Sequence, residues 1–295
     1  MKFSLILATI RRTFELDRLL ESLCAQTHRD FELLVIGGDS TAVPDYVEEY
    51  GSRLPMRYLG GAKGHSKALN WGLRQATGDV VAFPDDDCWY SPDLLARVDQ
   101  QLRANPEWSA VTGRSVTAEG TPSSGRWHRR AGLVSRINVW QRGVTITMFL
   151  RRTAVLGCLF DESLGVGAGT VWGAGEETDF LLQVLGKGGQ IHYDPSLMVY
   201  HPEWGNGPYT PAVCAKARSY GRGVGRVLRK HQYRLPVVGY HLLRPLGGSL
   251  LYWAAFRPDK ARYHWSIFSG RTVGWWQDVP PVPACRELTP EQDRH

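Results

Sequence analysis

Residues 79–87 read DVVAFPDDD, a short apolar run that ends in three consecutive aspartates. The run from Val80 to Phe83 has the length and composition of a buried strand. Before it, residues 67–76 carry leucines at helical spacing. The sequence therefore predicts a helix, a strand and an acidic cluster at the strand's carboxyl end.

The same alternation of strands and helices fills the first 100 residues. Apolar runs predict further strands over residues 3–9, 31–36 and 56–59, and leucine spacing predicts helices over residues 16–23 and 94–102. This alternation favours an α/β fold, with a mostly parallel sheet that is flanked by helices and joined by right-handed crossovers. Ligands of such sheets bind beyond the carboxyl ends of the strands, where the aspartates fall.

The second third of the chain is less regular. Residues 115–130 are rich in Gly, Ser, Pro and Arg and predict a mobile loop. Residues 144–150 predict a strand, residues 176–185 a helix and residues 191–200 another strand.

The C-terminal region has a different character. Residues 212–230 predict a basic helix, and residues 237–256 form an apolar, aromatic run that Arg244-Pro245 and Gly247-Gly248 interrupt. A charge and a proline near the centre of this run argue against a membrane-spanning helix. The run is interpreted as a helical hairpin or an interfacial segment.

The chain of 295 residues is basic, with a formal net charge of +6. No Asp or Glu occurs from Trp204 to Pro258, where nine Lys and Arg residues gather, so the rest of the chain is slightly acidic. A basic surface favours an anionic partner: nucleotide phosphates, nucleic acid or a membrane. The five cysteines are scattered and form no CxxC pair, which indicates neither a zinc site nor a disulfide framework and favours a reducing compartment.

The first acidic cluster consists of Asp85, Asp86 and Asp87. Three adjacent carboxylates repel one another unless a cation neutralises them. Their oxygen atoms suit Mg²⁺ or Mn²⁺, ions that usually bridge to substrate phosphates. The alternative is a solvated turn, since aspartate is common in turns.

The second acidic cluster consists of Glu176, Glu177 and Asp179, and it opens a predicted helix. Acidic residues complement the N-terminus of a helix, which is one explanation of the cluster. Three carboxylates in four positions exceed that need, and a clustered carboxylate with a raised pKa fits a general base. His201 follows a predicted strand and is either a structural histidine or a metal ligand.

Four stretches together resemble the family 2 glycosyltransferases, which have the GT-A fold, and in particular the bacterial polysaccharide and rhamnosyltransferase-like branch. They read LATIRRTFELDRLLESLCAQTHRDFELLVI (7–36), KGHSKALNWGLRQATGDVVAFPDDDCWYSPDLL (63–95), FDESLGVGAGTVWGAGEETDFLLQVLGKGGQIHYDPSLMVYHP (160–202) and RPLGGSLLYWAAF (244–256). The resemblance implies a Rossmann-like GT-A sheet with a C-terminal helical extension. It also implies a metal-dependent transfer of a sugar from a nucleotide-sugar to an acceptor hydroxyl, with inversion of the anomeric centre.

The resemblance implies a role for each acidic residue. Asp87 would be the principal metal ligand, Asp85 would contact the metal or the donor ribose, and Asp86 would lie beside them in the donor site. Glu177 would deprotonate the acceptor hydroxyl, with Glu176 and Asp179 in support. His201 would join the metal ligands, and donor contacts are implied for Thr9, Arg12, Glu15, Lys67 and Asn70.

One position departs from the family pattern. Many relatives carry a pair of aspartates after the second strand, one of which binds the uracil ring, whereas this chain has Gly37-Gly38-Asp39. Asp39 is the candidate substitute, and the nucleotide base stays unassigned.

The predicted organisation has three parts: a GT-A catalytic domain over 1–210 (nucleotide-binding half 1–110, acceptor half 111–210), a basic and aromatic helical extension over 211–279, and a flexible tail over 280–295. The predicted cofactor is Mn²⁺ or Mg²⁺, and the predicted partners are a nucleotide-sugar and a carbohydrate or lipid-linked acceptor. Residues 212–276 are interpreted either as a peripheral contact with the cytoplasmic face of the inner membrane or as a face packed on the catalytic domain.

Three other protein classes explain the sequence less well. A metal-dependent nucleotidyltransferase usually carries a glycine-rich phosphate loop near its first strand, and residues 8–13 contain no glycine. A non-catalytic sugar-binding protein on the same scaffold needs no pair of acidic clusters. A nucleic-acid-binding protein accounts for the basic region but not for the acidic strand end, so no nucleic-acid partner is expected.

Overall fold

A single mixed sheet forms the centre of the computed structural model, which describes residues 1–9, 14–37, 46, 48–61, 64–123, 125–202 and 207–277. Its strand order is β3-β2-β1-β4-β8-β6-β9-β5, and β7 pairs with β9. The strands are β1 (Phe3–Thr9), β2 (Phe31–Gly37), β3 (Met56–Tyr58), β4 (Val80–Ala82), β5 (Trp89–Tyr90), β6 (Trp108–Val116), β7 (Gly132–Leu133), β8 (Met148–Arg151) and β9 (Gln190–Tyr200).

Most strands of this sheet run in the same direction, and only β5, β7 and β8 run the opposite way. β1 pairs in parallel with β2 and β4, β2 with β3, and β6 with β9. β8 runs antiparallel between β4 and β6, and β5 and β7 run antiparallel to β9. The predicted mostly parallel sheet is confirmed. Because its parallel strands end at the same edge, the polar side chains that follow these strands lie along that edge.

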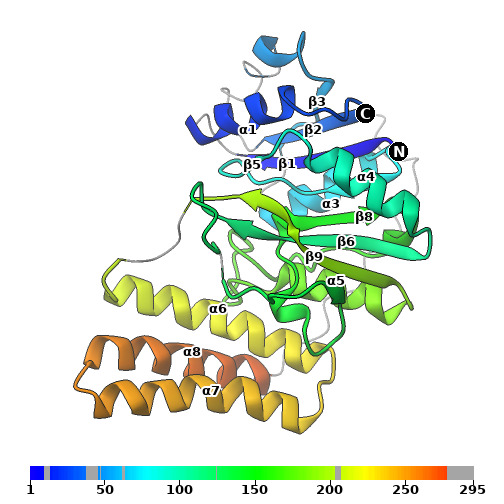
Figure 1. The fold of residues 1–295 in the computed structure, drawn as a ribbon. Coiled ribbons are helices and arrows are strands. Elements are labelled where there is room, and N and C mark those ends of the chain that lie inside the picture. Colours follow the sequence, from blue (N-terminus) through cyan, green and yellow to red (C-terminus); the bar gives the residue numbers. More distant parts are fainter. Residues whose placement is uncertain are drawn as a thin grey trace, which may run out of the picture.

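Helices cover both faces of the sheet (Figure 1). They are α1 (Phe14–Cys24), α3 (His65–Gln75), α4 (Leu94–Ala104) and α5 (Glu176–Gly186), with 3-10 turns at Val139–Gln141, Thr145–Thr147 and Arg152–Val155. Side chains alternate between the two faces of β1, so Leu5 and Leu7 pack with the leucines of α1 and α4, whereas Ile6 packs with Leu69 of α3 and Phe180 of α5. Burial of both faces explains why the strands read as continuous apolar runs.

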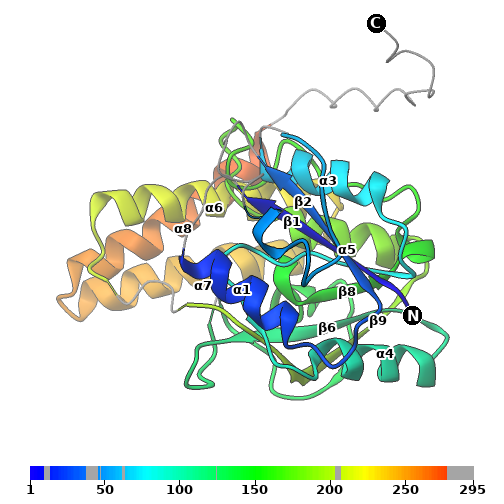
Figure 2. The ribbon, with the colours of Figure 1, turned by 90° about the horizontal axis from the view of Figure 1, so that it is seen from above.

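Three C-terminal helices, α6 (Pro211–Lys230), α7 (Leu235–Ala254) and α8 (Pro258–Trp276), form a layer beside the sheet (Figure 1). Seen from above, they extend past the sheet on the side toward which β1 runs (Figure 2). α8 packs against both α6 and α7. Glycines let α6 and α8 approach backbone to backbone, because a Cβ on Gly274 would collide with the carbonyl oxygen of Arg222.

Of the two interpretations of residues 237–256, the helical hairpin is wrong, because α7 is one helix with Pro245 inside it, and the interfacial segment stays a prediction. Proline has no N–H and leaves the carbonyl group of His241, four residues earlier, without its helical partner. Arg271 of α8 donates from Nη1 to that carbonyl oxygen over 2.6 Å. The hairpin of this region is instead made by α7 and α8 together. In the described part of the chain, no helix is both long and apolar enough to cross a membrane.

The middle of the chain differs from its prediction in two places. The strand predicted over 144–150 begins only at Met148, because Thr147 closes a 3-10 turn with its hydroxyl, which donates to the Val144 carbonyl over 3.0 Å. β6 was not predicted and takes the first two residues of the predicted loop over 115–130, because its polar residues interrupt the apolar run. The predicted tail over 280–295 lies outside the described residues.

Candidate active site

The first acidic cluster lies where β4 ends. Asp85 pairs with Ala8 through an isolated parallel bridge, so the carboxyl ends of β1 and β4 meet at this point. The Thr9 hydroxyl donates to Asp86 Oδ2 over 2.7 Å. Each of Asp85, Asp86 and Asp87 offers a carboxylate oxygen within 4.8 Å of the other two. The predicted clustering of three carboxylates at a strand end is therefore present.

His201 faces this cluster from the end of β9. The antiparallel pairing of Trp89 with Tyr200 brings the two segments together, and His201 Nε2 lies 3.1 Å from Asp87 Oδ1. The other ring nitrogen, Nδ1, lies 2.7 Å from the carbonyl oxygen of Pro202, which can only accept, so Nδ1 donates. Loss of the proton on Nε2 would leave a lone pair on the Asp87 side of the ring, where it could bind a metal together with the carboxylate.

The electrostatics of the cluster fit a divalent cation. Burial raises the pKa of Asp85. Burial and the charges of Asp85 and Asp87 raise the pKa of Asp86 to about 6. Burial alone would lower the pKa of His201, but the hydrogen bond and charge of Asp87 raise it. Crowded carboxylate oxygens and one imidazole nitrogen are a donor set that Mn²⁺ and Mg²⁺ accept, and a bound cation would offset their repulsion.

The second acidic cluster opens α5. Burial and the charge of Glu177 raise the pKa of Glu176 well above its usual range. Burial also raises the pKa of Glu177, although hydrogen bonds from backbone N–H groups and from Glu176 act to lower it. Two carboxyl groups share a hydrogen bond only if one is protonated, so Glu176 and Glu177 hold one proton between them and leave one carboxylate. The N-terminus of α5 stabilises that negative charge.

The two acidic clusters belong to one site. The charge of Asp85 contributes to the raised pKa of Glu176. The glycine-rich segment 165–175 contacts the second cluster: Gly165, at φ 96°, leaves room for the Glu176 carboxyl, since a Cβ there would lie 2.7 Å from Glu176 Cδ. The site thus places a candidate cation-binding edge beside a candidate base.

A cavity of about 650 Å³ opens beside Glu177, between the start of α5 and the C-terminal helices. Gly175, Glu177 and Thr178 line it from the start of α5. Side chains of α7 and α8 line the opposite wall, among them Arg244, Tyr252, Tyr263 and Arg271. Glu177 therefore lies at the boundary of a space large enough for a sugar-sized ligand.

Residues 4–159, more than half of the chain, match the model of the family described as Glycosyl transferase family 2. The chain belongs to this family. It is similar to the succinoglycan biosynthesis protein ExoM of Rhizobium meliloti, with 32% identity over 241 residues that cover 77% of this chain and 75% of that protein. A shorter match, 30% identical over 105 residues, covers 35% of this chain and 42% of the UDP-Glc:alpha-D-GlcNAc-diphosphoundecaprenol beta-1,3-glucosyltransferase WfgD of Escherichia coli.

The fold of this glycosyltransferase is also similar to solved GT-A structures. S. aureus TarS aligns with a TM-score of 0.59 and 16% identity, over 96% of this chain and 95% of that one. The mannosyltransferase PcManGT of Pyrobaculum calidifontis, in complex with GDP-Man and Mn²⁺, aligns with a TM-score of 0.62 and 17% identity, over 93% and 87% of the two chains. The predicted GT-A fold is confirmed.

The predicted donor contacts lie at different distances from the acidic edge. Glu15, in the first turn of α1, is close enough for its charge to raise the pKa of Asp86. Asn70 is buried, donates its amide to the carbonyl oxygen of Phe160 over 2.9 Å, and accepts from the backbone N–H of Phe160 over 2.8 Å. It anchors the segment before the glycine-rich loop. Lys67 is exposed on α3. Arg12 and Asp39 lie outside the described residues.

Asp179 is fully buried and points away from the cluster's two glutamates toward α6. Its carboxylate accepts from Lys230 Nζ at 2.9 Å and lies 2.7 Å from His231 Nε2. Gln183 donates to it over 2.8 Å. These contacts join the first turn of α5 to the end of α6, so its geometry fits a positioning role for the base rather than contact with substrate.

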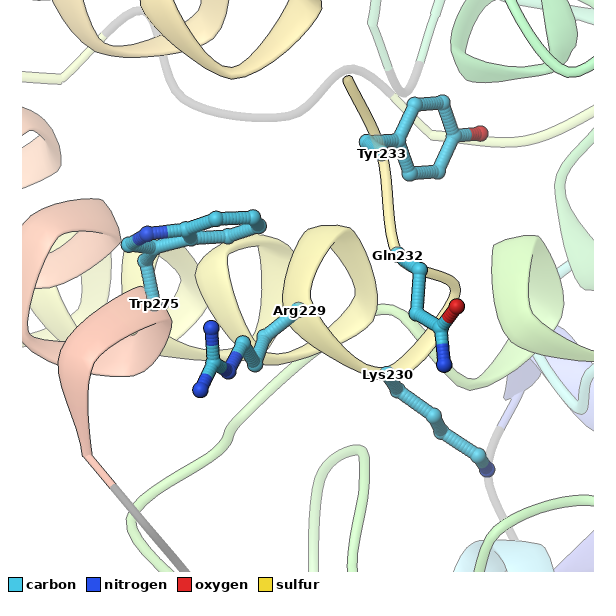
Figure 3. A pocket seen from close by; sticks show the side chains of 5 residues that line it. All are labelled: Arg229, Lys230, Gln232, Tyr233 and Trp275. Atoms are coloured by element: carbon cyan, nitrogen blue, oxygen red, sulfur yellow. The ribbon is translucent and has the colours of Figure 1, made fainter. Parts of the chain in front are cut away.

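A smaller cavity of about 490 Å³ is lined by Lys230 together with Arg229, Gln232, Tyr233 and Trp275 (Figure 3). Arg229 stacks over Trp275 at 5.6 Å, while Lys230 extends the other way (Figure 3). The amino group of Lys230 is held by Asp161 at 2.8 Å as well as by Asp179. The cavity thus lies between the end of α6, the turn that leads to α7, and the end of α8.

Three sets of residues at the site were not predicted from the sequence: His65, Arg18 and the arginines of the cavity. His65, at the start of α3, is close enough for its charge to lower the pKa of Asp85, and its place after Gly64 in the matching stretch was the available signal. Arg18 of α1 stacks over Trp89 at 3.4 Å and fixes the strand that follows the aspartates. The cavity arginines had no sequence signal, because the fold brings them together from distant segments.

Proposed function

We propose that this glycosyltransferase is metal-dependent and inverting, and that it moves a sugar from a nucleotide-sugar to an acceptor hydroxyl during assembly of a bacterial surface polysaccharide or glycolipid. The observation that carries the proposal is the adjacency of the two acidic clusters. Asp85 is close enough for its charge to raise the pKa of Glu176, and Glu177 lines a cavity. ExoM and WfgD support the substrate class, and the Mn²⁺ complex of PcManGT supports the cofactor.

The metal residues in this proposal are Asp87, Asp85 and His201, with Asp86 held by Thr9 beside them. When bound, Mn²⁺ or Mg²⁺ supplies positive charge that stabilises the departing nucleoside diphosphate. The chain's own part is to fix the donor set: the Pro202 carbonyl orients the His201 ring, and the β5–β9 pairing holds it against Asp87.

Glu177 is the base in this proposal. It takes the proton of the acceptor hydroxyl as that oxygen bonds to the anomeric carbon, and the bond from this carbon to the diphosphate oxygen breaks on the opposite face. One displacement of this kind inverts the anomeric centre. In this proposal Glu176 keeps the shared proton and donates to Glu177, which orients the base. The glycine-rich segment 165–175 closes around the glutamates and limits access of water.

The test is turnover of UDP-, dTDP- and GDP-sugars, followed as nucleoside diphosphate release with Mn²⁺. Glu177→Gln should lower the rate by about 10²- to 10⁴-fold, the usual contribution of general base catalysis. Glu119→Gln, a matched change at a fully exposed glutamate, should leave the rate unaltered. Turnover of Glu177→Gln within a few fold of the wild-type rate rejects Glu177 as the base.

The membrane partner is also part of this proposal. α7 exposes large apolar side chains, among them Leu250 at 62%, Trp253 at 73% and Phe256, just beyond the helix, at 94%. Basic residues of the same region favour an anionic lipid surface. Co-sedimentation with vesicles that contain phosphatidylglycerol should retain the wild type and release Trp253→Ser. Equal retention of both proteins removes this contact from the proposal.

A further inference from the structure

The cavity beside Glu177 carries more positive charge than its carboxylate balances. Three arginines from distant segments line it: Arg126 before β7, Arg244 on α7 and Arg271 on α8. Glu177 is the one carboxylate among its described lining residues. In the described part of the chain, no carboxylate forms an ion pair with any of the three arginines. A cationic cavity of this kind attracts an anion from outside.

The histidines of the cavity report the same imbalance. Burial and then the charges of Arg271 and Arg244 lower the pKa of His241 to about 4. Burial, followed by the charge of Arg126, lowers the pKa of His264. Arg271 is itself only partly satisfied, since Nη1 donates to the His241 carbonyl but its buried Nε has no hydrogen-bond partner among the described residues. The guanidinium groups therefore retain donors for a ligand.

The remaining walls of the cavity indicate what kind of molecule the anionic group belongs to. Trp140, Tyr252 and Tyr263 line the cavity with aromatic faces of the kind that sugar rings stack on. Tyr240 and Leu251 line it as well, and both belong to the exposed apolar surface of α7. The cavity is thus polar and cationic within and continuous with an apolar surface outside.

We infer that this cavity is the acceptor site and that it selects an acceptor whose sugar is esterified to a phosphate or diphosphate, with Arg126, Arg244 and Arg271 binding the phosphate oxygens. This inference rests on the proposed function, because Glu177 marks the cavity as the acceptor side. Three guanidinium groups match the two or more charges of a diphosphate better than the single charge of a carboxylated sugar. The phosphate or diphosphate group belongs either to a soluble ester or to a lipid-linked one.

The test measures calorimetric binding of three probes in EDTA: farnesyl diphosphate, inorganic pyrophosphate and farnesol. Without a cation the three aspartates repel diphosphates, so binding reports on the cavity. Both diphosphates should bind the wild type and lose about tenfold or more in affinity in Arg126→Gln and Arg244→Gln, which change exposed arginines. Arg262→Gln, an α8 arginine that is 75% exposed and pairs with Asp259, is the matched control and should bind as the wild type does.

The relative affinities identify the source of the anion. Tighter binding of farnesyl diphosphate than of pyrophosphate supports a lipid-linked acceptor, and equal binding supports a soluble phosphate ester. No saturable binding of either diphosphate, unchanged affinity in both variants, or equal binding of farnesol overturns the inference. Stabilisation by nucleotide and Mn²⁺, measured in the same samples, tests the donor site separately, so failure of the proposed function is distinguishable from failure of the acceptor inference.

Discussion

Replacing Asp179 by asparagine tests how the C-terminal helices are held to the catalytic sheet. The carboxylate is fully buried and accepts from Lys230 at 2.9 and 3.0 Å, from Gln183 at 2.8 Å, and contacts His231 at 2.7 Å. Removing one partner of a buried ion pair costs about 3–5 kcal/mol. Lys230 is 33% exposed and keeps Asp161 at 2.8 Å, so solvent and the second carboxylate reduce the loss to about 2–3 kcal/mol.

The assay is thermal unfolding followed by circular dichroism at neutral pH. A loss of this size should lower Tm by about 5–10 °C in a domain of this length. Asp259→Asn is the matched control, because Asp259 is 70% exposed and lies 3.8 Å from Arg262. Adding Lys230→Met to Asp179→Asn should cost less than the two single changes combined, because the charge that lost its partner is then gone. A Tm for Asp179→Asn within 1 °C of the wild-type value, or strict additivity, refutes the ion pair as the joint.

Three further predictions follow from the packing and the electrostatics. Gly274→Ala should destabilise the chain by about 1–3 kcal/mol, since the added Cβ meets the Arg222 backbone, whereas Gly247→Ala, with open space around it in α7, should be neutral or slightly stabilising in urea unfolding. Gly165→Ala should lower donor turnover by about 10- to 100-fold without loss of stabilisation by nucleotide and Mn²⁺, because it displaces the Glu176 carboxyl; an unaltered rate contradicts this. Burial alone would raise the pKa of Asp161, but Lys230 and Ser163 lower it. The ionised Asp161 therefore contributes fully to the stability of the fold above about pH 4, and this contribution is lost as the pH falls further. Between about pH 4 and pH 2, the Tm of Asp161→Asn should thus fall less steeply than that of the wild type.

The sequence predicted the elements that follow a simple period. The apolar run of β4 reflects burial on both faces of the sheet, and the leucine spacing of α1 reflects burial against one face; sequence patterns record both directly. The aspartates after β4 were found for the same reason, because their position follows from that strand. Burial of a strand on both faces thus allows a site at its end to be predicted.

The features that sequence patterns did not predict depend on contacts between distant segments. Pro245 suggested a break in the helix, yet Arg271, 26 residues later, satisfies the carbonyl group that the proline leaves free. Asn70, whose donor contact stays a prediction, also exchanges two hydrogen bonds with the backbone of Phe160, 90 residues later. The arginines of the acceptor cavity lie in three separate segments, so their convergence follows only from the folded chain.

The most direct test of the donor site is thermal stability with UDP, dTDP and GDP, each with and without Mn²⁺. One nucleotide at about 100 times its Kd should stabilise the wild type by about 2.7 kcal/mol, only with the metal present. Asp87→Ala should abolish this shift, and Asp259→Ala, at an exposed site, should retain it. No shift with any nucleotide in a folded sample, or an equal shift in Asp87→Ala, contradicts the assignment of this edge as a metal-dependent nucleotide-sugar site.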